Sequence, residues 1–133
     1  MTSYVSHTSV DCHDAYALSE FWRKVLGYVD REDDPNEPGH EECPIHDPET
    51  GHELLFIEVP DTKTVKNRIH LDLRPRAVTR DEELARLLAL GATEVDDQRG
   101  KYGPGTGWVV LADPEGNEFC ILRSDAEVAA SGG

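Results

Sequence analysis

The chain has 133 residues, with 27 acidic and 13 basic side chains and a formal net charge of −14. This length suits one compact domain with a buried core. The excess of carboxylates excludes nucleic acid as the expected partner, because binding to phosphates depends on lysine and arginine. Such a charge keeps a protein soluble, and it would also suit a cationic small-molecule ligand.

Targeting signals are not evident in the sequence. No stretch is apolar enough and long enough to cross a membrane, and the N-terminal MTSYVSHTSVD lacks the basic and apolar segments of a signal peptide. Three cysteines are an odd number and too few for a disulfide scaffold. We therefore expect a cytoplasmic protein with no membrane partner.

The first half of the chain begins with a strand and a helix. Residues 4–12 are strand-like. A helix is predicted over 14–26, with Asp14 as its N-cap and Gly27 at its C-terminal stop. Its apolar residues fall on one helical face: Leu18, Phe21, Trp22, Val25 and Leu26.

Two short strands follow, near 42–46 and 53–58, joined by the sequence DPETG. Almost the same motif, DPEG, returns at 113–116 ahead of another strand-like segment. The recurrence predicts that one turn-and-strand unit is used twice.

The second half repeats the order of the first. Residues 67–73 alternate in polarity, with Ile69, Leu71 and Leu73 expected to pack beneath the helices together with Phe119. A capping box at Thr79 starts a helix over 79–90. Strands near 93–95, 108–112 and 117–122 complete this half, a glycine-rich loop spans 99–107, and the last ten residues are expected to fray.

The repeat predicts an α+β fold of two βαβββ modules, at about 4–58 and 67–123, within a single domain over 1–133. A strand histidine marks the same place in each module, since His7 precedes Gly27 by 20 residues and His70 precedes Gly91 by 21. The helices should lie on the outside of a curved sheet.

Three stretches carry a family resemblance: HTSVDCHD followed by FWRKVLG, then RIHLDL, then DPEGNEFCIL. In this order they are similar to the vicinal oxygen chelate superfamily of glyoxalase I, bleomycin-resistance proteins and extradiol dioxygenases, and most of all to its glyoxalase-like domains. The resemblance covers about residues 4–123. It implies a U-shaped mixed sheet around a cavity, and a homodimer.

The resemblance also implies a metal position. Metal-dependent members bind a divalent ion through a histidine on each first strand and a carboxylate on each last strand. His7 and His70 occupy the histidine slots here, whereas Leu55 and Cys120 occupy the carboxylate slots. Two histidines and a thiolate suit zinc rather than an octahedral metal. The site is incomplete, so no cofactor is certain and we expect no tightly held metal.

Nearby carboxylates offer alternatives. Glu53 and Glu118 lie two residues before these slots on the same strand face, so a shifted carboxylate would rescue either slot. Asp72 shares a face with the second-module histidine, and Asp72 and Glu53 are the candidate catalytic acid–base groups. For Asp72 the alternative is a salt bridge to Arg68 or Arg74.

Six residues are expected to bind the small-molecule ligand: His7, His70, Cys120, Trp108, Arg68 and Leu55. Trp108 follows the glycine-rich loop and would line a pocket mouth. Arg68 belongs to a basic stretch, 63–68, that would steer an anionic group, or alternatively form solvated surface or a subunit contact. Cys120 is alternatively a buried apolar filler.

Two functions remain open. One is a metal-assisted enzyme, a glyoxalase-like lyase or dioxygenase-related catalyst acting on a small oxygenated substrate. The other is a metal-free protein that sequesters a drug, as bleomycin-resistance proteins do. The missing ligand carboxylates argue against glyoxalase I itself.

Overall fold

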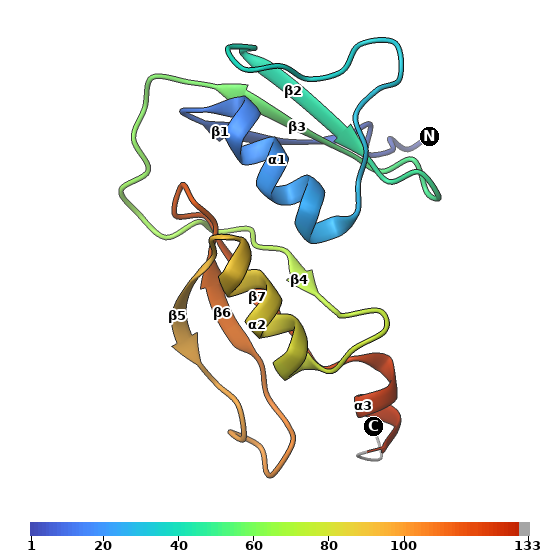
Figure 1. The fold of residues 1–133 in the computed structure, drawn as a ribbon, viewed down its shortest axis with the longest axis vertical. Helices are drawn as coiled ribbons and strands as arrows, with labels where there is room; N and C mark the ends of the chain where they lie inside the picture. The colour runs from blue at the N-terminus through green and yellow to red at the C-terminus, as the bar shows by residue number, and fades with distance from the viewer. Residues whose placement is uncertain (131–133) are drawn as a thin grey trace. The chain divides into compact units, whose positions relative to one another are not determined.

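The computed structural model describes residues 1–130 and divides into two compact units, Met1–Lys63 and Thr64–Gly133 (Figure 1). Each unit has a mixed sheet, of three strands in the first and four in the second, with a helix that follows its first strand. The predicted α+β class is therefore confirmed. None of the helices within residues 1–130 combines the length and apolar character needed to cross a bilayer.

The first unit has three strands and one helix: β1 (Thr8–Cys12), α1 (Ala15–Leu26), β2 (Glu42–His46) and β3 (Glu53–Glu58). The strand order is β1-β3-β2, with β1 parallel and β2 antiparallel to β3. Where a fourth strand of a βαβββ module would follow the helix, Val29 makes an isolated antiparallel bridge to His46.

Helix α1 forms where its caps and periodicity predict. The side chain of Asp14 accepts a hydrogen bond from the Ala17 N–H at 3.1 Å, which satisfies one of the open amides of the first turn. The apolar face of the helix is buried and contacts β2 and β3. It packs against side chains of these strands, of which Leu54 and Phe56 are almost fully buried.

The second unit has four strands and two helices: β4 (Asp72–Leu73), α2 (Arg80–Leu90), β5 (Thr93–Asp97), β6 (Val109–Ala112), β7 (Glu118–Ile121) and α3 (Asp125–Ala130). The strand order is β4-β7-β6-β5. β4 runs parallel to β7, while β6 is antiparallel to both β5 and β7.

Alternation along β6 and β7 gives this sheet two different faces. Four alternating side chains form its buried face under α2: Val109, Leu111, Phe119 and Ile121. Helix α2 runs across this part of the sheet (Figure 1) and contributes the buried Leu87. The residues in between, Val110 and Cys120 among them, point to the opposite face.

The expected packing of residues 67–73 is only partly correct. Phe119 is buried as predicted, but Ile69 is 86% exposed and Leu71 and Leu73 are half-buried. Pairing with β7 begins only where the Cys120 N–H donates to the Leu71 carbonyl at 2.9 Å. Ile69 lies before this edge strand, beyond the paired part of the sheet, so its unit provides nothing to cover it.

The C-terminal segment is a helix where fraying was expected, and residues 131–133 of that segment lie outside the described residues. The Ser124 hydroxyl accepts a hydrogen bond from the Glu127 N–H at 3.1 Å, and the Glu127 carboxylate accepts one from the Ser124 N–H at 3.0 Å. These reciprocal bonds are a capping box. Glu127 also accepts a hydrogen bond from the Arg80 N–H at 2.6 Å, which ties α3 to the start of α2.

The repeated Asp-Pro-Glu motif forms related turns in both units, closed by a backbone hydrogen bond from Gly51 to Asp47 at 2.8 Å in the first and from Gly116 to Asp113 at 2.9 Å in the second, which is one residue shorter. The Asp47 side chain accepts a hydrogen bond from the Glu49 N–H at 2.8 Å, and Asp113 accepts one from Glu115 at 2.9 Å. Each turn ends in a glycine with positive φ, Gly51 or Gly116.

Candidate functional site

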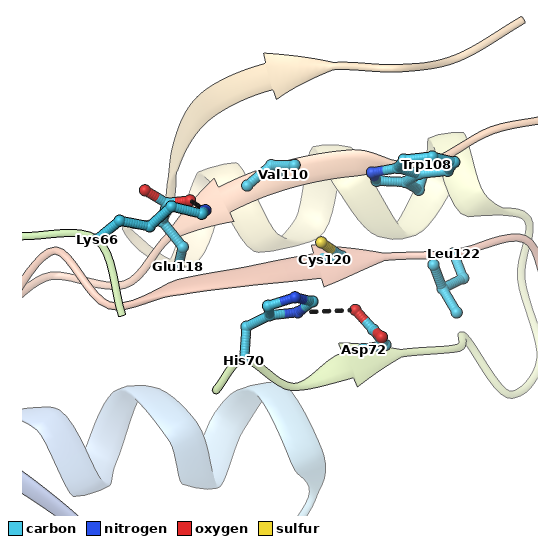
Figure 2. Close-up of a pocket in the computed structure, with 8 residues that line it drawn as sticks. All are labelled: Lys66, His70, Asp72, Trp108, Val110, Glu118, Cys120 and Leu122. Carbon is cyan, nitrogen blue, oxygen red and sulfur yellow. Dashed lines mark hydrogen bonds and ion pairs between the residues drawn. The ribbon is translucent and has the colours of Figure 1, made fainter. Parts of the chain in front are cut away.

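A pocket of about 370 Å³ lies in the second unit, on the sheet face opposite α2 (Figure 2). Apart from Lys66, its lining residues recur at every second position of three neighbouring chain segments in and next to β4, β6 and β7, which is the spacing of one sheet face. They are Lys66, His70, Asp72, Trp108, Val110, Glu118, Cys120 and Leu122.

The middle of the pocket holds a group of three potential metal ligands, His70, Asp72 and Cys120. One donor atom from each lies within 4.8 Å of the others. Asp72 and Cys120 are direct partners in the parallel pairing of β4 with β7. The imidazole Nδ1 of His70 lies 3.2 Å from Oδ1 of Asp72, so a carboxylate orients the ring (Figure 2).

The Cys120 thiol is held in its neutral form. Burial, together with the negative charge of Asp72, raises the pKa of Cys120 from 9.0 to about 11. At neutral pH the sulfur therefore carries a proton, and a metal ion must displace that proton to gain a thiolate ligand.

One end of the pocket is formed by an ion pair between Lys66 and Glu118. Asn67 holds the adjoining backbone, since its side-chain oxygen accepts a hydrogen bond from the Glu118 N–H at 2.8 Å. Its amide nitrogen donates to the carbonyls of Ile69 at 2.8 Å and Glu118 at 3.1 Å. These bonds hold the segment before β4 against β7.

The predicted site residues of the first unit are placed as follows. His7 is exposed and directly precedes β1, and its Nδ1 lies 3.0 Å from the Ser6 hydroxyl. Leu55 is half-buried on β3. Glu53 starts β3, and its Oε1 accepts a hydrogen bond from Nη2 of Arg31 at 2.8 Å. The participation of all three in a ligand site stays a prediction.

In the second unit His70, Cys120 and Trp108 line one pocket, and Asp72 joins His70 and Cys120 in the group of potential metal ligands. Arg68 is exposed and is not among the lining residues.

Two predicted alternatives take other partners. Arg74, considered as an ion-pair partner of Asp72, instead donates to the Arg123 carbonyl at 2.6 Å. Glu118, considered as a shifted ligand, lines the pocket but pairs with Lys66.

The donor set suits one kind of ion. A ring nitrogen, a carboxylate oxygen and a sulfur match zinc, whose catalytic sites use three protein ligands and keep one position open. Manganese and magnesium prefer oxygen ligands, so a sulfur donor disfavours them. These three residues of the second unit therefore have the donor chemistry that fits a zinc-type ion.

The whole chain shares its fold with solved proteins of low sequence identity. A mutant of the fosfomycin resistance protein FosX from Listeria monocytogenes, solved with Mn(II) and 1S,2S-dihydroxypropylphosphonic acid, is 18% identical, with a TM-score of 0.66 over 96% of this chain and 94% of that chain. A glyoxalase/bleomycin resistance protein/dioxygenase family enzyme from Burkholderia phytofirmans PsJN is 20% identical, with a TM-score of 0.64 over 90% and 97%. A possible glyoxalase from Bacillus cereus is 16% identical, with a TM-score of 0.62 over 91% and 99%.

These neighbours define the vicinal oxygen chelate fold. Residues 7–122 match the model of the glyoxalase-like domain, and the chain belongs to that family. No functionally curated protein is significantly similar to the sequence.

Sequence reasoning missed the pocket contributions of Val110 and Leu122 and treated Lys66 only as part of a basic stretch. The signal was present as alternation, since Trp108 and Val110, and likewise Glu118, Cys120 and Leu122, are two residues apart. The alternation does not tell which face of the sheet carries the pocket. That becomes clear only from the structure, in which α2 covers the other face.

Proposed function

We propose that this protein binds a small oxygenated molecule in the pocket of its second unit, and that a zinc-type ion held by His70, Asp72 and Cys120 assists binding and chemistry there. The observation that carries the proposal is the convergence of these three donors within 4.8 Å in a pocket. Metal ions polarise bound oxygens as Lewis acids, which is the chemistry such an ion would supply.

The chain's own groups have separate roles in this proposal. Asp72 orients the His70 ring through the 3.2 Å contact with Nδ1, which leaves Nε2 as the ring's second nitrogen for an ion or a ligand. Lys66 provides positive charge at the polar end of the pocket, where an anionic oxygen of the ligand would replace part of its pairing with Glu118. Trp108 and Leu122 supply apolar contact.

The proposed reaction class is that of a glyoxalase-like lyase or a related metal-assisted enzyme, but not glyoxalase I. The FosX neighbour was solved with Mn(II), which prefers oxygen donors. The Cys120 thiol makes the donor set of the present chain less suited to manganese. We expect no useful turnover of the methylglyoxal–glutathione adduct with nickel or zinc, and ordinary glyoxalase activity would contradict this.

Metal binding tests the proposal directly. Calorimetric titration of tag-free protein with zinc should show one site, with manganese binding more weakly, and His70→Ala should weaken zinc binding at least tenfold. His46→Ala is the matched control, because this histidine lies on β2 of the first unit. Equal zinc affinity in wild type and His70→Ala would overturn the metal proposal and leave metal-free sequestration of a small molecule as the function.

Domain organisation and assembly are part of the same proposal. We place both units in one glyoxalase-like domain that forms a homodimer, as the family resemblance implies, and we place the protein in the cytoplasm because its three cysteines do not form a disulfide scaffold. His7→Ala tests whether the first unit also contributes to the metal site, since a loss of zinc affinity would add His7 to the ligands. Light scattering at micromolar concentration tests the dimer, and a particle with the mass of one chain would contradict it.

A further inference from the structure

The pocket is polar at one end and apolar at the other. In Figure 2, Lys66 and Glu118 lie at one end, and Trp108 and Leu122 lie at the other. Strand register explains the separation, because β6 and β7 are antiparallel with Val109 opposite Ile121 and Ala112 opposite Glu118. Trp108 and Leu122 each lie one residue beyond the first of these pairs, so both fall at the end away from Glu118.

Trp108, at the apolar end of the pocket, lies beside Tyr102 of the glycine-rich loop. The ring centroids of Tyr102 and Trp108 are 6.1 Å apart with an interplanar angle of 31°. The ammonium of Lys101 lies 5.7 Å from the centroid of each ring. This places two aromatic rings side by side next to the pocket wall.

The loop that carries these rings is held in place from α2. Arg80 is only 6% exposed. Its guanidinium donates hydrogen bonds to the carbonyls of Thr106 at 2.8 Å and Gly107 at 3.1 Å. A Cβ on Gly107 would lie 2.0 Å from the Gln98 carbonyl oxygen, so only glycine permits this close approach. The backbone directly before Trp108 is therefore fixed before any ligand arrives, which lowers the entropy cost of binding.

The geometry points to a ligand with two distinct parts: an oxygen-bearing head at His70 and Asp72, and a flat aromatic tail that packs on Trp108 between Leu122 and the loop. This assignment rests on the proposed function and specifies its ligand class. Aromatic groups prefer offset or tilted arrangements with neighbouring rings, which the Tyr102–Trp108 pair offers. The pocket volume of about 370 Å³ admits one ring and a small head group.

Two hydroxamates form a matched pair of probes, because both present two adjacent oxygens and only the tail differs. The experiment measures calorimetric affinities of benzohydroxamate and acetohydroxamate for the zinc-loaded full chain. Benzohydroxamate should bind about tenfold more tightly, from the extra apolar area that its ring buries. Trp108→Ala should abolish this preference, while Tyr102→Ala should reduce it about threefold.

The control variant is Tyr4→Ala, because Tyr4 is an exposed tyrosine of the first unit and its removal should leave the preference unchanged. Tyr102 is 70% exposed, so its truncation tests the loop even if Trp108→Ala disturbs folding. Equal affinity for the two probes, or a preference that survives in both Trp108→Ala and Tyr102→Ala, overturns the tail subsite while the metal-assisted function stands. Binding of neither probe overturns both.

Discussion

The two units share a backbone plan but differ in what their equivalent positions carry. In the first unit Ser9 pairs with Leu55 between parallel strands, and in the second Asp72 pairs with Cys120 in the same way. A histidine precedes the first residue of each pair by two positions. The potential metal-ligand group described above draws only on the second unit. The shared register thus places equivalent side chains alike, while the residue types at these positions decide which unit brings potential ligands together.

The cores of the two units differ in a second way. With Leu55 and Cys120 equivalent, Leu54 corresponds to Phe119, and Phe56 corresponds to Ile121. All four side chains are at most 1% exposed. The larger side chain comes second in β3 and first in β7. Combined volume is nearly conserved, which is the kind of change that packed cores tolerate best.

Introducing the second unit's potential ligands into the first unit should change the protein's metal binding most. Ser9→Asp combined with Leu55→Cys recreates the His-Asp-Cys set on β1 and β3, because the strand registers match. Zinc titration should then show two sites per chain in place of one. Ser9→Asp alone is the control, and a stoichiometry that stays at one in the double variant would show that register is insufficient.

Truncation of equivalent core residues compares the stability of the two units. Phe119→Ala should lower the free energy of unfolding by about 3–5 kcal/mol, and Leu54→Ala by about 2–5 kcal/mol. Both side chains are almost completely buried, so each substitution leaves a cavity. Urea denaturation measures both losses. A cost below about 1 kcal/mol for either would mean that its sheet is less well packed than described.

The Cys120 thiol should make the free energy of unfolding depend on pH. Leu55, its equivalent in the first unit, has no group that titrates. The folded-state pKa of Cys120 is raised to about 11 from 9.0, so the stabilising effect is complete below pH 9 and is lost as pH rises towards 11. The loss should reach about 2–3 kcal/mol for that shift. Urea denaturation of wild type and Cys120→Ala at pH 8 and 10.5 measures this loss, because only the wild type has the thiol. Parallel pH profiles would contradict the assignment.

The smallest expected effect concerns the repeated turn. Gly51 and Gly116 have φ values of 80° and 86°, and a Cβ at either position would meet nothing within 4 Å. Alanine should therefore cost only the strain of the left-handed backbone, about 1–2 kcal/mol at each position. Thermal unfolding of the two variants should give similar shifts, and a clear difference between them would show that the two glycines are not equally strained, despite their similar φ values.

Most elements were predictable because their signals are local. The cap at Asp14, the capping box at Thr79 and the apolar helical stripes need no partner to be recognised. The exposed Ile69 was not predictable, because alternation identifies a face without showing that a neighbour covers it. The capping box of Ser124 and Glu127 was available as a local signal, but the small residues around it obscured it.

Individual site residues could be proposed from local sequence patterns, but contacts between residues far apart in the chain could not. His70, Cys120 and Trp108 were each proposed from the sequence as pocket residues, and Asp72 was proposed as a partner of the histidine. The contact of Asp72 with Cys120 follows from the pairing of β4 with β7, which no local pattern specifies. The ion pair of Lys66 with Glu118 likewise joins segments 52 positions apart.

The hydrogen bond from the Arg80 N–H to the Glu127 carboxylate makes hydrogen exchange at this amide a way to follow the docking of α3. First-turn amides of a helix usually lack an intrahelical acceptor and exchange their hydrogens quickly with solvent. Here one such amide is protected by a residue 47 positions later. Its exchange rate therefore measures how often α3 detaches, and a fusion or label joined after residue 130 can be judged by whether that single amide keeps its protection.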